Sequence, residues 1–266
     1  MNHISQILQK KRQSSACALI PFVTAGYPNL DVTIKILYTL DKNGADVIEL
    51  GIPYSDALAD GPMIQKSSKV ALEQGVYIDQ VLNILNTVRY KLSAPIVIFT
   101  YYNPILFRGV NLFIQEISLC GVKGLIVPDL PIEETDYLTS LCLEYSIELI
   151  LFIAPTSSSD RISKILNKAP GCVYLVSSTG VTGIRNDVNN QIDSLSTYIK
   201  STTDKLVMLG FGISNVSQVA QVSNWDVDAL VVGSAFTRIL SSNLNYESAI
   251  QSVGVFCNNM KSAILT

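Results

Sequence analysis

Hydrophobic residues follow two alternating patterns along this chain. Short, almost continuous runs of apolar and often β-branched residues are typical of strands that are buried on both faces. They predict strands at Ala18–Thr24, Asp46–Leu50, Pro95–Tyr101, Gly124–Pro128, Glu148–Ile153, Cys172–Ser177, Leu206–Gly210 and Ala229–Gly233. Between these runs, apolar residues return every three or four positions, which is typical of amphipathic helices. Helices are predicted at Asp31–Asn43, Ile78–Lys91, Leu112–Cys120, Glu133–Tyr145, Ser159–Asn167 and Asn215–Gln221.

This alternation predicts parallel strands joined by crossover helices, and two architectures satisfy it. An open, nucleotide-binding sheet has a glycine-rich fingerprint after its first strand, whereas here that strand ends in FVTAGYP, without GxGxxG. The glycine-rich turns follow the sixth, seventh and eighth strands, a region where barrels commonly bind phosphate. We therefore predict an α/β fold, a (β/α)8 TIM barrel, with MNHISQILQKKRQ as an additional N-terminal helix.

The length of the chain fits one barrel. Its 266 residues contain no linker rich in Pro, Gly or Ser and no internal repeat, so we predict a single TIM-barrel domain over residues 1–266. The longest irregular stretches are Pro53–Pro62 and Thr179–Asn190. Both follow the carboxyl end of a predicted strand, and barrel active sites lie at that end.

Composition narrows the function classes. Hydrophobic residues make up 48% of the chain and charged residues 15%, which allows a large core and argues against disorder. The net charge of −3, without a basic stripe, gives no support to nucleic-acid binding. No apolar run approaches the ~18 residues of a membrane span, and the N-terminus lacks the apolar region of a signal peptide. We expect a cytoplasmic protein, or one of the plastid stroma if the gene is organelle-encoded.

The cysteine and histidine content excludes several kinds of chemistry. The five cysteines are scattered without a CxxC pair, which is typical of reduced core cysteines. His3 is the only histidine and lies in the N-terminal segment, so Ser-His-Asp, Cys-His and histidine-based metal sites lack their central residue. We expect no metal site, and the chemistry must use carboxylates, tyrosines, lysines or a borrowed cofactor.

Two carboxylates are candidates for acid–base catalysis. Glu49 lies near the end of the apolar strand DVIELG, where partial desolvation raises a carboxyl pKa toward a useful range. A structural ion pair explains an acidic strand end equally well. Asp60, in the loop YSDALADGP, can reach the other side of a bound substrate, and two carboxylates in different environments can divide acid and base roles. Asp56 is the competing acid of that loop.

Three glycine-containing turns follow the last three predicted strands: STGVTG (Ser178–Gly183), GFGIS (Gly210–Ser214) and VVGSAF (Val231–Phe236). Glycine lets the backbone approach an anion closely, and successive N–H groups form a nest. Ser234 leads into a helix whose N-terminus adds partial positive charge. Together the three turns predict a phosphate site.

Further candidates lie near strand ends. Four aromatic residues could form a ligand wall, although core packing explains each one singly: Phe22, Tyr102, Tyr174 and Phe211. Asp129, in VPDLP, is a third acid at a strand end. Lys123 and Lys205 lie at strand starts, so a Schiff-base lysine is not indicated.

Seven segments form an ordered series from Pro21 to Phe236: PFVTAGYP, ELGIPYSDALADGP, TYYNPI, GLIVPDLP, YLVSSTGVTG, LGFGIS and VVGSAF. They resemble the successive signature blocks of the tryptophan synthase alpha subunit family, and the second block alone is too long for chance agreement. The resemblance implies a carbon–carbon lyase of tryptophan biosynthesis. Its reaction is the retro-aldol cleavage of indole-3-glycerol phosphate to indole and glyceraldehyde 3-phosphate.

The resemblance also implies residue roles. Glu49 resembles the general acid that protonates the indole carbon and handles the glycerol hydroxyl proton, and Asp60 resembles the residue that stabilises charge at the indole N–H. The substrate-binding positions correspond to Phe22, Tyr102, Asp129, Tyr174, Thr182, Gly183, Phe211, Gly212, Gly233 and Ser234. The loops Pro53–Gly61 and Thr179–Asn190 resemble mobile lids that exclude water.

The implied partner is a beta subunit that carries pyridoxal phosphate and condenses indole with serine. A hetero-tetramer of two alpha and two beta chains is expected, with no cofactor in this chain. Partner contacts are expected at Pro53, Asp56, Asn103 and Pro104. Ala57 stands where the family loop usually has proline, which frees the backbone and can alter lid mobility or partner contact.

Two alternatives stay open. A barrel that binds a beta subunit only as a non-catalytic allosteric partner is mildly favoured by Ala57 and opposed by the presence of Glu49 and Asp60. A different phosphate-binding barrel enzyme, such as a sugar-phosphate isomerase or decarboxylase, usually offers a catalytic Lys or His at a strand end, and this chain offers neither.

Overall fold

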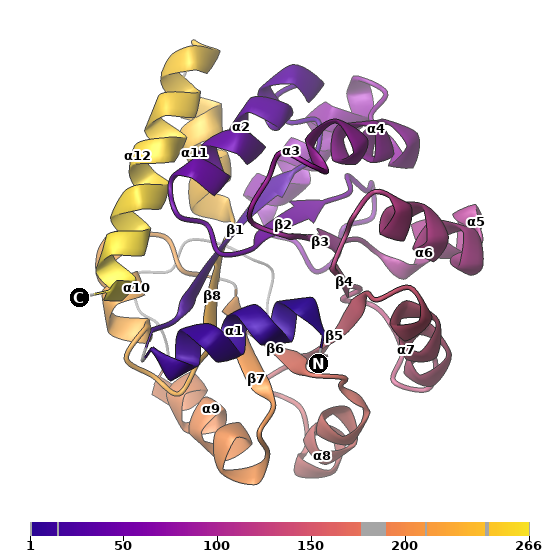
Figure 1. Ribbon diagram of the computed structural model, residues 1–266, viewed down its shortest axis with the longest axis vertical. Helices are drawn as coiled ribbons and strands as arrows, with labels where there is room; N and C mark the ends of the chain where they lie inside the picture. Colours follow the sequence, from indigo (N-terminus) through magenta and orange to yellow (C-terminus); the bar gives the residue numbers. More distant parts are fainter. Residues whose placement is uncertain (1, 15, 177–189, 211, 243–244, 266) are drawn as a thin grey trace.

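The computed structural model describes residues 2–14, 16–176, 190–210, 212–242 and 245–265. Within these ranges, eight strands form one closed barrel in chain order, and helices surround it (Figure 1). The strands are β1 (Ala18–Thr24), β2 (Ile48–Gly51), β3 (Ile96–Phe99), β4 (Gly124–Ile126), β5 (Glu148–Ile153), β6 (Cys172–Val176), β7 (Leu206–Gly210) and β8 (Ala229–Val232).

In the described part of the chain, one helix precedes β1 and one or two helices follow each strand. They are α1 (His3–Gln13), α2 (Leu30–Lys42), α3 (Pro62–Glu73), α4 (Ile78–Val88), α5 (Tyr102–Arg108), α6 (Val110–Leu119), α7 (Thr135–Glu144), α8 (Ser159–Lys168), α9 (Asn190–Thr202), α10 (Val216–Val222), α11 (Ser234–Ser242) and α12 (Tyr246–Leu265). The additional N-terminal helix that the sequence predicts is α1.

The first strand closes the barrel by pairing with the last. Ala18 of β1 lies in parallel register with Ala229 of β8, and every other strand pairs in parallel with the next one along the chain. The predicted TIM barrel is confirmed, and the open doubly wound sheet is excluded because such a sheet has two edges.

Several elements begin or end away from their predicted limits. β2 begins at Ile48 and not at Asp46, whose carboxylate accepts the backbone N–H of Leu19 at 2.8 Å. β3 ends at Phe99, and α5 begins three residues later at Tyr102. The helices α3, α5, α9 and α12 are absent from the prediction. In most of these helices, serine, asparagine and glutamine interrupt the row of apolar residues, so the local sequence pattern is weak. Their stability comes from burial against the barrel, which a local pattern does not show.

Side chains alternate strictly between the two faces of the barrel wall. In β1, for example, Ala18, Ile20 and Phe22 belong to the cluster inside the barrel, whereas Leu19 and Val23 belong to the cluster between the barrel and its helices. The same alternation places inside the barrel Val47, Val97, Phe99, Ile126, Ile150, Cys172, Tyr174, Leu206, Met208, Ala229 and Val231. Since Val47 faces inward, the period of two also directs Glu49 into the barrel.

Helix α1 covers the amino-terminal end of the barrel, and Figure 1 shows it crossing in front of the strands. Its residues Ile4 and Leu8 belong to the cluster inside the barrel. Ser5 of α1 donates its backbone N–H (3.0 Å) and its hydroxyl to the carboxylate of Glu148, the first residue of β5. Glu148 also accepts the backbone N–H of Cys172 at 2.8 Å, so it joins α1 to two strands.

Candidate active site

Glu49 is buried in the carboxyl-terminal half of the barrel. It lies in register with Phe22 of β1 and Val97 of β3, and Glu49 is only 1% exposed. Among the described residues, its Oε2 atom has no hydrogen-bond partner. Burial, followed by the nearby charge of Asp60, raises the pKa of Glu49 from 4.5 to about 8. Glu49 is therefore a neutral acid near pH 7 with one oxygen that no described residue engages.

Asp60 is placed by the turn that ends at the start of α3. Its backbone N–H donates to the carbonyl of Ala57 at 3.1 Å, and it precedes Gly61, the residue that caps α3. Asp60 is 5% exposed, and its carboxylate accepts a hydrogen bond from the hydroxyl of Tyr101 at 2.9 Å. Burial raises the pKa of Asp60 to about 6, and the hydrogen bond from Tyr101 opposes that rise. Asp60 is therefore mostly ionised near pH 7.

The two carboxyl groups consequently differ in protonation. With the pKa of Glu49 near 8 and that of Asp60 near 6, neutral pH leaves a proton on Glu49 and a negative charge on Asp60. Two titratable groups whose environments separate their pKa values can serve as acid and as charge-stabilising base in one site. Because the charge of Asp60 contributes to the pKa of Glu49, the structure brings the two predicted catalytic residues together.

Tyr174 lies beside this pair. Its ring stacks on Phe152 with centroids 4.7 Å apart. Burial, and then the charges of Glu49 and Asp60, raise its pKa well above 10, so its hydroxyl keeps its proton. Gly210 provides the necessary space, because a Cβ atom there would lie 2.0 Å from the Tyr174 hydroxyl.

Phe22 begins a row of aromatic rings at the barrel mouth. It meets Phe99 edge to face at 5.8 Å, and Phe99 meets Tyr101 in the same way at 6.1 Å. Two glycines leave room for the Phe22 ring, since Cβ atoms would lie 2.6 Å from it at Gly51 and 3.3 Å from it at Gly233. The mouth is thus lined by flat apolar surfaces beside the two carboxyl groups.

The structure brings Tyr101 to the site, and it places Tyr102 elsewhere. Tyr102 is the first residue of α5 and packs against the cluster outside the barrel, while its backbone N–H donates to Asp129 at 2.8 Å. Asp129 is exposed, and its carboxylate satisfies a backbone N–H at the start of α5. Sequence reasoning missed Tyr101, although the period of two was a usable signal: Val97 and Phe99 face inward, so the next inward position is Tyr101.

The predicted phosphate turns are described only in part. Gly212 has a φ of +92°, a left-handed conformation that favours glycine. Gly233 and Ser234 are half-buried, and Ser234 is the first residue of α11, whose N-terminal N–H groups can face an anion. Thr182, Gly183 and Phe211 lie outside the described residues.

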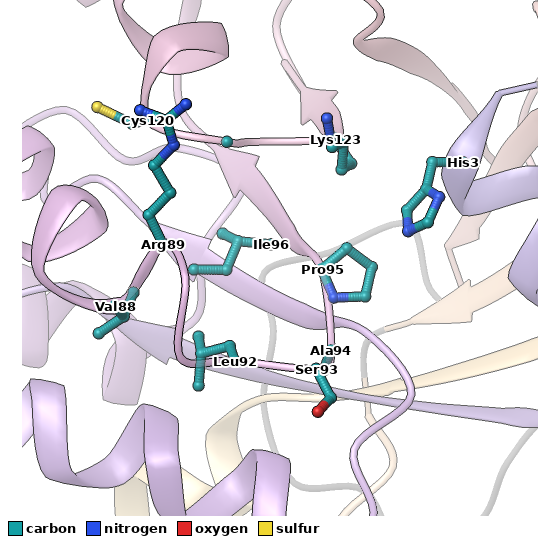
Figure 2. A pocket seen from close by; sticks show the side chains of 11 residues that line it. His3, Val88, Arg89, Leu92, Ser93, Ala94, Pro95, Ile96, Cys120 and Lys123 are labelled. Atoms are coloured by element: carbon teal, nitrogen blue, oxygen red, sulfur yellow. The ribbon is translucent and has the colours of Figure 1, made fainter.

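The opposite end of the barrel offers no comparable chemistry. A cavity of about 160 Å³ lies there, and Figure 2 shows the side chains of His3, Arg89 and Lys123 around it. Its wall includes Val88, the last residue of α4, so the basic groups lie where a helix C-terminus attracts them. His3 is thus remote from Glu49, and no cluster of metal-ligating side chains occurs among the described residues.

A groove borders the carboxyl-terminal end of the barrel. Its volume is about 620 Å³, and its walls include Pro53, Tyr54, Asn103, Pro104 and Phe107. Three of the four predicted partner-contact residues therefore line one surface. The fourth, Asp56, is exposed and accepts the hydroxyl of Ser55 at 2.9 Å.

A TIM barrel with a buried pair of carboxyl groups at its carboxyl-terminal mouth defines an enzyme class that works by acid–base chemistry. Comparison with known proteins identifies the family. The family described as "Tryptophan synthase alpha chain" matches residues 8–265, and the chain belongs to it.

Relatives of the chain agree with this assignment. The alpha chain of Gracilaria tenuistipitata var. liui is 59% identical over 266 residues, covering 100% of this chain and 98% of that one. The alpha chain of Synechocystis is 48% identical, covering 99% and 100% respectively. The structure also resembles Mycobacterium tuberculosis tryptophan synthase (TM-score 0.91, 28% identity, 99% and 98% covered) and the Legionella pneumophila alpha subunit (TM-score 0.88, 31% identity, 99% and 98% covered).

Membership of this family defines the class of reaction that the chain catalyses. The chain is a tryptophan synthase alpha chain by family, and the role of the family is the lyase half-reaction that cleaves indole-3-glycerol phosphate in tryptophan biosynthesis. The family name implies a beta subunit as partner. Within the described part of the chain, no helix is long and apolar enough to cross a membrane.

Proposed function

We propose that Glu49 and Asp60 carry out the cleavage of indole-3-glycerol phosphate in this chain. The single observation that supports these roles is the burial of Glu49 beside the charge of Asp60, with one oxygen that has no partner in the described part of the chain. A buried polar atom without a partner is rare in proteins, and a functional role explains why it persists. The substrate itself then supplies the missing partner.

The reaction requires one proton at carbon 3 of the indole ring before the carbon–carbon bond can break. Glu49 donates this proton, because its raised pKa keeps it protonated near pH 7. Loss of a proton from the glycerol hydroxyl then forms the aldehyde and releases the indole carbon. Glu49, now a carboxylate, accepts that proton, so donation and acceptance balance and the enzyme returns to its starting state.

Asp60 acts on the charge that develops at the same time. Protonation of carbon 3 makes the ring nitrogen cationic, and an anion near its N–H lowers the energy of that intermediate. Asp60 is the ionised member of the pair near pH 7 and can accept the indole N–H. Phe22 and the protonated Tyr174 complete the wall around the ring in this proposal.

The phosphate of the substrate is assigned to the late turns. Gly233 brings the backbone close to the site, and the N-terminus of α11 at Ser234 adds partial positive charge. Gly212 belongs to the same region by its place after β7. Gly183 enters this phosphate site, and Thr182 the substrate site, from the family resemblance alone. The same resemblance alone assigns Phe211 and Tyr102 to the wall around the indole ring, with Asp129 as their neighbour.

The partner is assigned to the groove beside the mouth. We infer that a beta subunit docks over Pro53, Asn103 and Pro104, in a hetero-tetramer of two alpha and two beta chains. Pyridoxal phosphate is assigned to that partner and not to this chain. We also propose one domain over residues 1–266, and a location in the cytoplasm or plastid stroma in keeping with red algal and cyanobacterial relatives.

A second candidate function is a non-catalytic activator of the beta subunit. The replacement of the usual loop proline by Ala57 favours it. Ala57 is buried within the cluster at the mouth and its carbonyl accepts both the N–H of Asp60 and the side chain of Gln65, at 3.1 and 3.2 Å. The loop is therefore folded onto the barrel without proline, which weakens this alternative.

Indole release tests the proposal. The purified chain is mixed with indole-3-glycerol phosphate, with and without a beta subunit, beside the variants Glu49→Gln and Asp56→Asn. We expect slow release alone, faster release with the partner, and a fall of at least about 100-fold in Glu49→Gln, since general acid catalysis contributes about 10²–10⁴-fold. Asp56→Asn, the exposed acid of the same loop, stays within a few-fold of the parent when the partner is absent. No indole from the folded parent under either condition would favour the non-catalytic activator.

A further inference from the structure

We propose that Tyr101 is a positioning residue for Asp60, holding both its carboxylate and the loop that carries it at the barrel mouth. This role rests on the proposed function, because it affects turnover only if Asp60 takes part in the reaction. Tyr101 touches Asp60 and the loop backbone, and it acts on the substrate through them.

The hydrogen bonds around the Tyr101 hydroxyl have a defined direction. The backbone N–H of Ala59 donates to this oxygen at 3.0 Å. The single hydroxyl proton is then directed to Oδ2 of Asp60, 2.9 Å away. The Tyr101 side chain, just after β3, thus holds Ala59 and Asp60, two neighbouring residues of a loop about 40 positions earlier in the chain. Such a hydrogen bond to an ionised carboxylate is about twice as strong as a neutral one.

Tyr101 remains the donor over the whole working range of pH. Burial and the charge of Asp60 raise the pKa of Tyr101 far above its ordinary value of 10, so the hydroxyl keeps its proton. Donation to the ionised form of Asp60 lowers the pKa of that carboxyl and opposes the effect of burial. Tyr101 therefore keeps Asp60 ionised at a pH lower than burial alone would allow.

The Tyr101 ring is itself fixed on two sides. Phe99 meets it edge to face at 6.1 Å, and Tyr54 lies against it at 5.2 Å with ring planes 33° apart. Tyr54 also accepts the side-chain amide of Asn103 at 3.2 Å and lines the groove beside the mouth. The hydroxyl of Tyr101 is consequently held in place by packing that does not depend on Asp60.

Gln65 provides a second tie to the same loop and a matched control. Its side-chain amide donates to the carbonyls of Ala57 (3.2 Å) and Asp60 (2.9 Å). These bonds hold the loop backbone but do not reach the Asp60 carboxylate. A change at Gln65 therefore loosens the loop without removing the hydrogen bond that sets the charge of Asp60.

The pH dependence of kcat/KM for indole release separates positioning from folding. In Tyr101→Phe, we expect the acid-side midpoint to move upward by about 0.5 to 1 pH unit, because Asp60 loses a donor. With the parent midpoint near 6, this corresponds at pH 6 to a further loss of about two- to four-fold beyond any loss at pH 7.5. Gln65→Ala is expected to lower the rate with an unmoved midpoint. A lower rate in Tyr101→Phe with an unmoved midpoint would overturn the positioning role.

A direct titration keeps this result separate from the lyase assignment. The carboxyl ¹³C resonance of Asp60, identified by its loss in Asp60→Asn, is followed against pH in the full chain without substrate. The Tyr101→Phe midpoint should lie above that of the parent and that of Gln65→Ala. Equal midpoints in all three proteins refute the role of Tyr101. A raised midpoint in a chain that releases no indole would support the contact while rejecting the proposed function.

Discussion

Glu49 and Glu148 show how neighbours decide the role of a single residue type. Both are buried glutamates on the inner side of barrel strands. Glu148 accepts three hydrogen bonds from Ser5 and Cys172, whereas Oε2 of Glu49 has no partner among the described residues. A satisfied buried carboxylate joins elements together, and an unsatisfied one is available for a proton transfer. Burial alone is therefore not a sign of catalysis.

The separated pKa values of the two site carboxyls predict the pH dependence of turnover. Activity requires Asp60 ionised, which is achieved as the pH rises through about 6, and Glu49 protonated, which is lost as the pH rises through about 8. We expect a bell-shaped profile of kcat/KM with its maximum between these values. The Asp60→Asn variant, if its residual rate is measurable, should lose the acid limb and keep the alkaline one. A profile that is flat from pH 5 to 9 would contradict these assignments.

At the scale of elements, the loop before α3 and the helix α1 are held by different means. The loop is tied by Tyr101 and Gln65 to two other segments near the mouth. Helix α1 covers the other end, where Ser5 contacts Glu148 across 143 positions of sequence. Contacts at the mouth thus hold a loop that carries a site residue, whereas contacts at the other end hold the closing helix, in line with the division between the two ends of barrel enzymes.

A change at Ser5 tests the role of α1. Ser5→Ala removes a hydroxyl donor from the buried Glu148, which is expected to lower the free energy of unfolding by about 1–3 kcal/mol. Ser14→Ala, at the exposed end of the same helix, should change it by less than about 0.5 kcal/mol. Urea unfolding of both variants measures the difference. Equal effects would show that the Ser5–Glu148 contact does not hold the helix in place.

At the scale of the whole molecule, the site and the groove lie on the same end of the barrel. Tyr54 lies in the groove wall and against Tyr101, which in turn holds Asp60. Phe107, which is 94% exposed, is the most prominent apolar side chain of the groove. Exposed aromatic residues next to a groove are typical of protein-binding surfaces.

Substitution of Phe107 tests the docking surface. Phe107→Asp places a charge in the groove and is expected to weaken binding of a beta subunit by at least about ten-fold, since aromatic anchors of interfaces often contribute 2 kcal/mol or more. Tyr90→Asp is the matched control, because Tyr90 is 83% exposed and follows the C-terminus of α4 at the other end. Titration calorimetry compares both with the parent. Unchanged affinity in Phe107→Asp would place the partner elsewhere.

The amino-acid sequence by itself determined the strand–helix alternation, the barrel, and Glu49 and Asp60 as the leading acids. Strand periodicity and turn chemistry depend on residues close together in the chain, so they can be read locally. The long block ELGIPYSDALADGP added the family, which the comparisons confirm.

Only the tertiary structure decided which neighbours give those residues their properties. Tyr101 and Asp60 are 41 positions apart, Ser5 and Glu148 are 143 apart, and no local pattern encodes either contact. Burial inside the closed barrel leaves one oxygen of Glu49 without a partner among the described residues, and it sets the order of the two carboxyl pKa values. Burial and hydrogen bonding are set by segments that meet only when β8 closes onto β1. For this physical reason the sequence could name the two acids and predict a raised pKa for Glu49, but could not order the two pKa values.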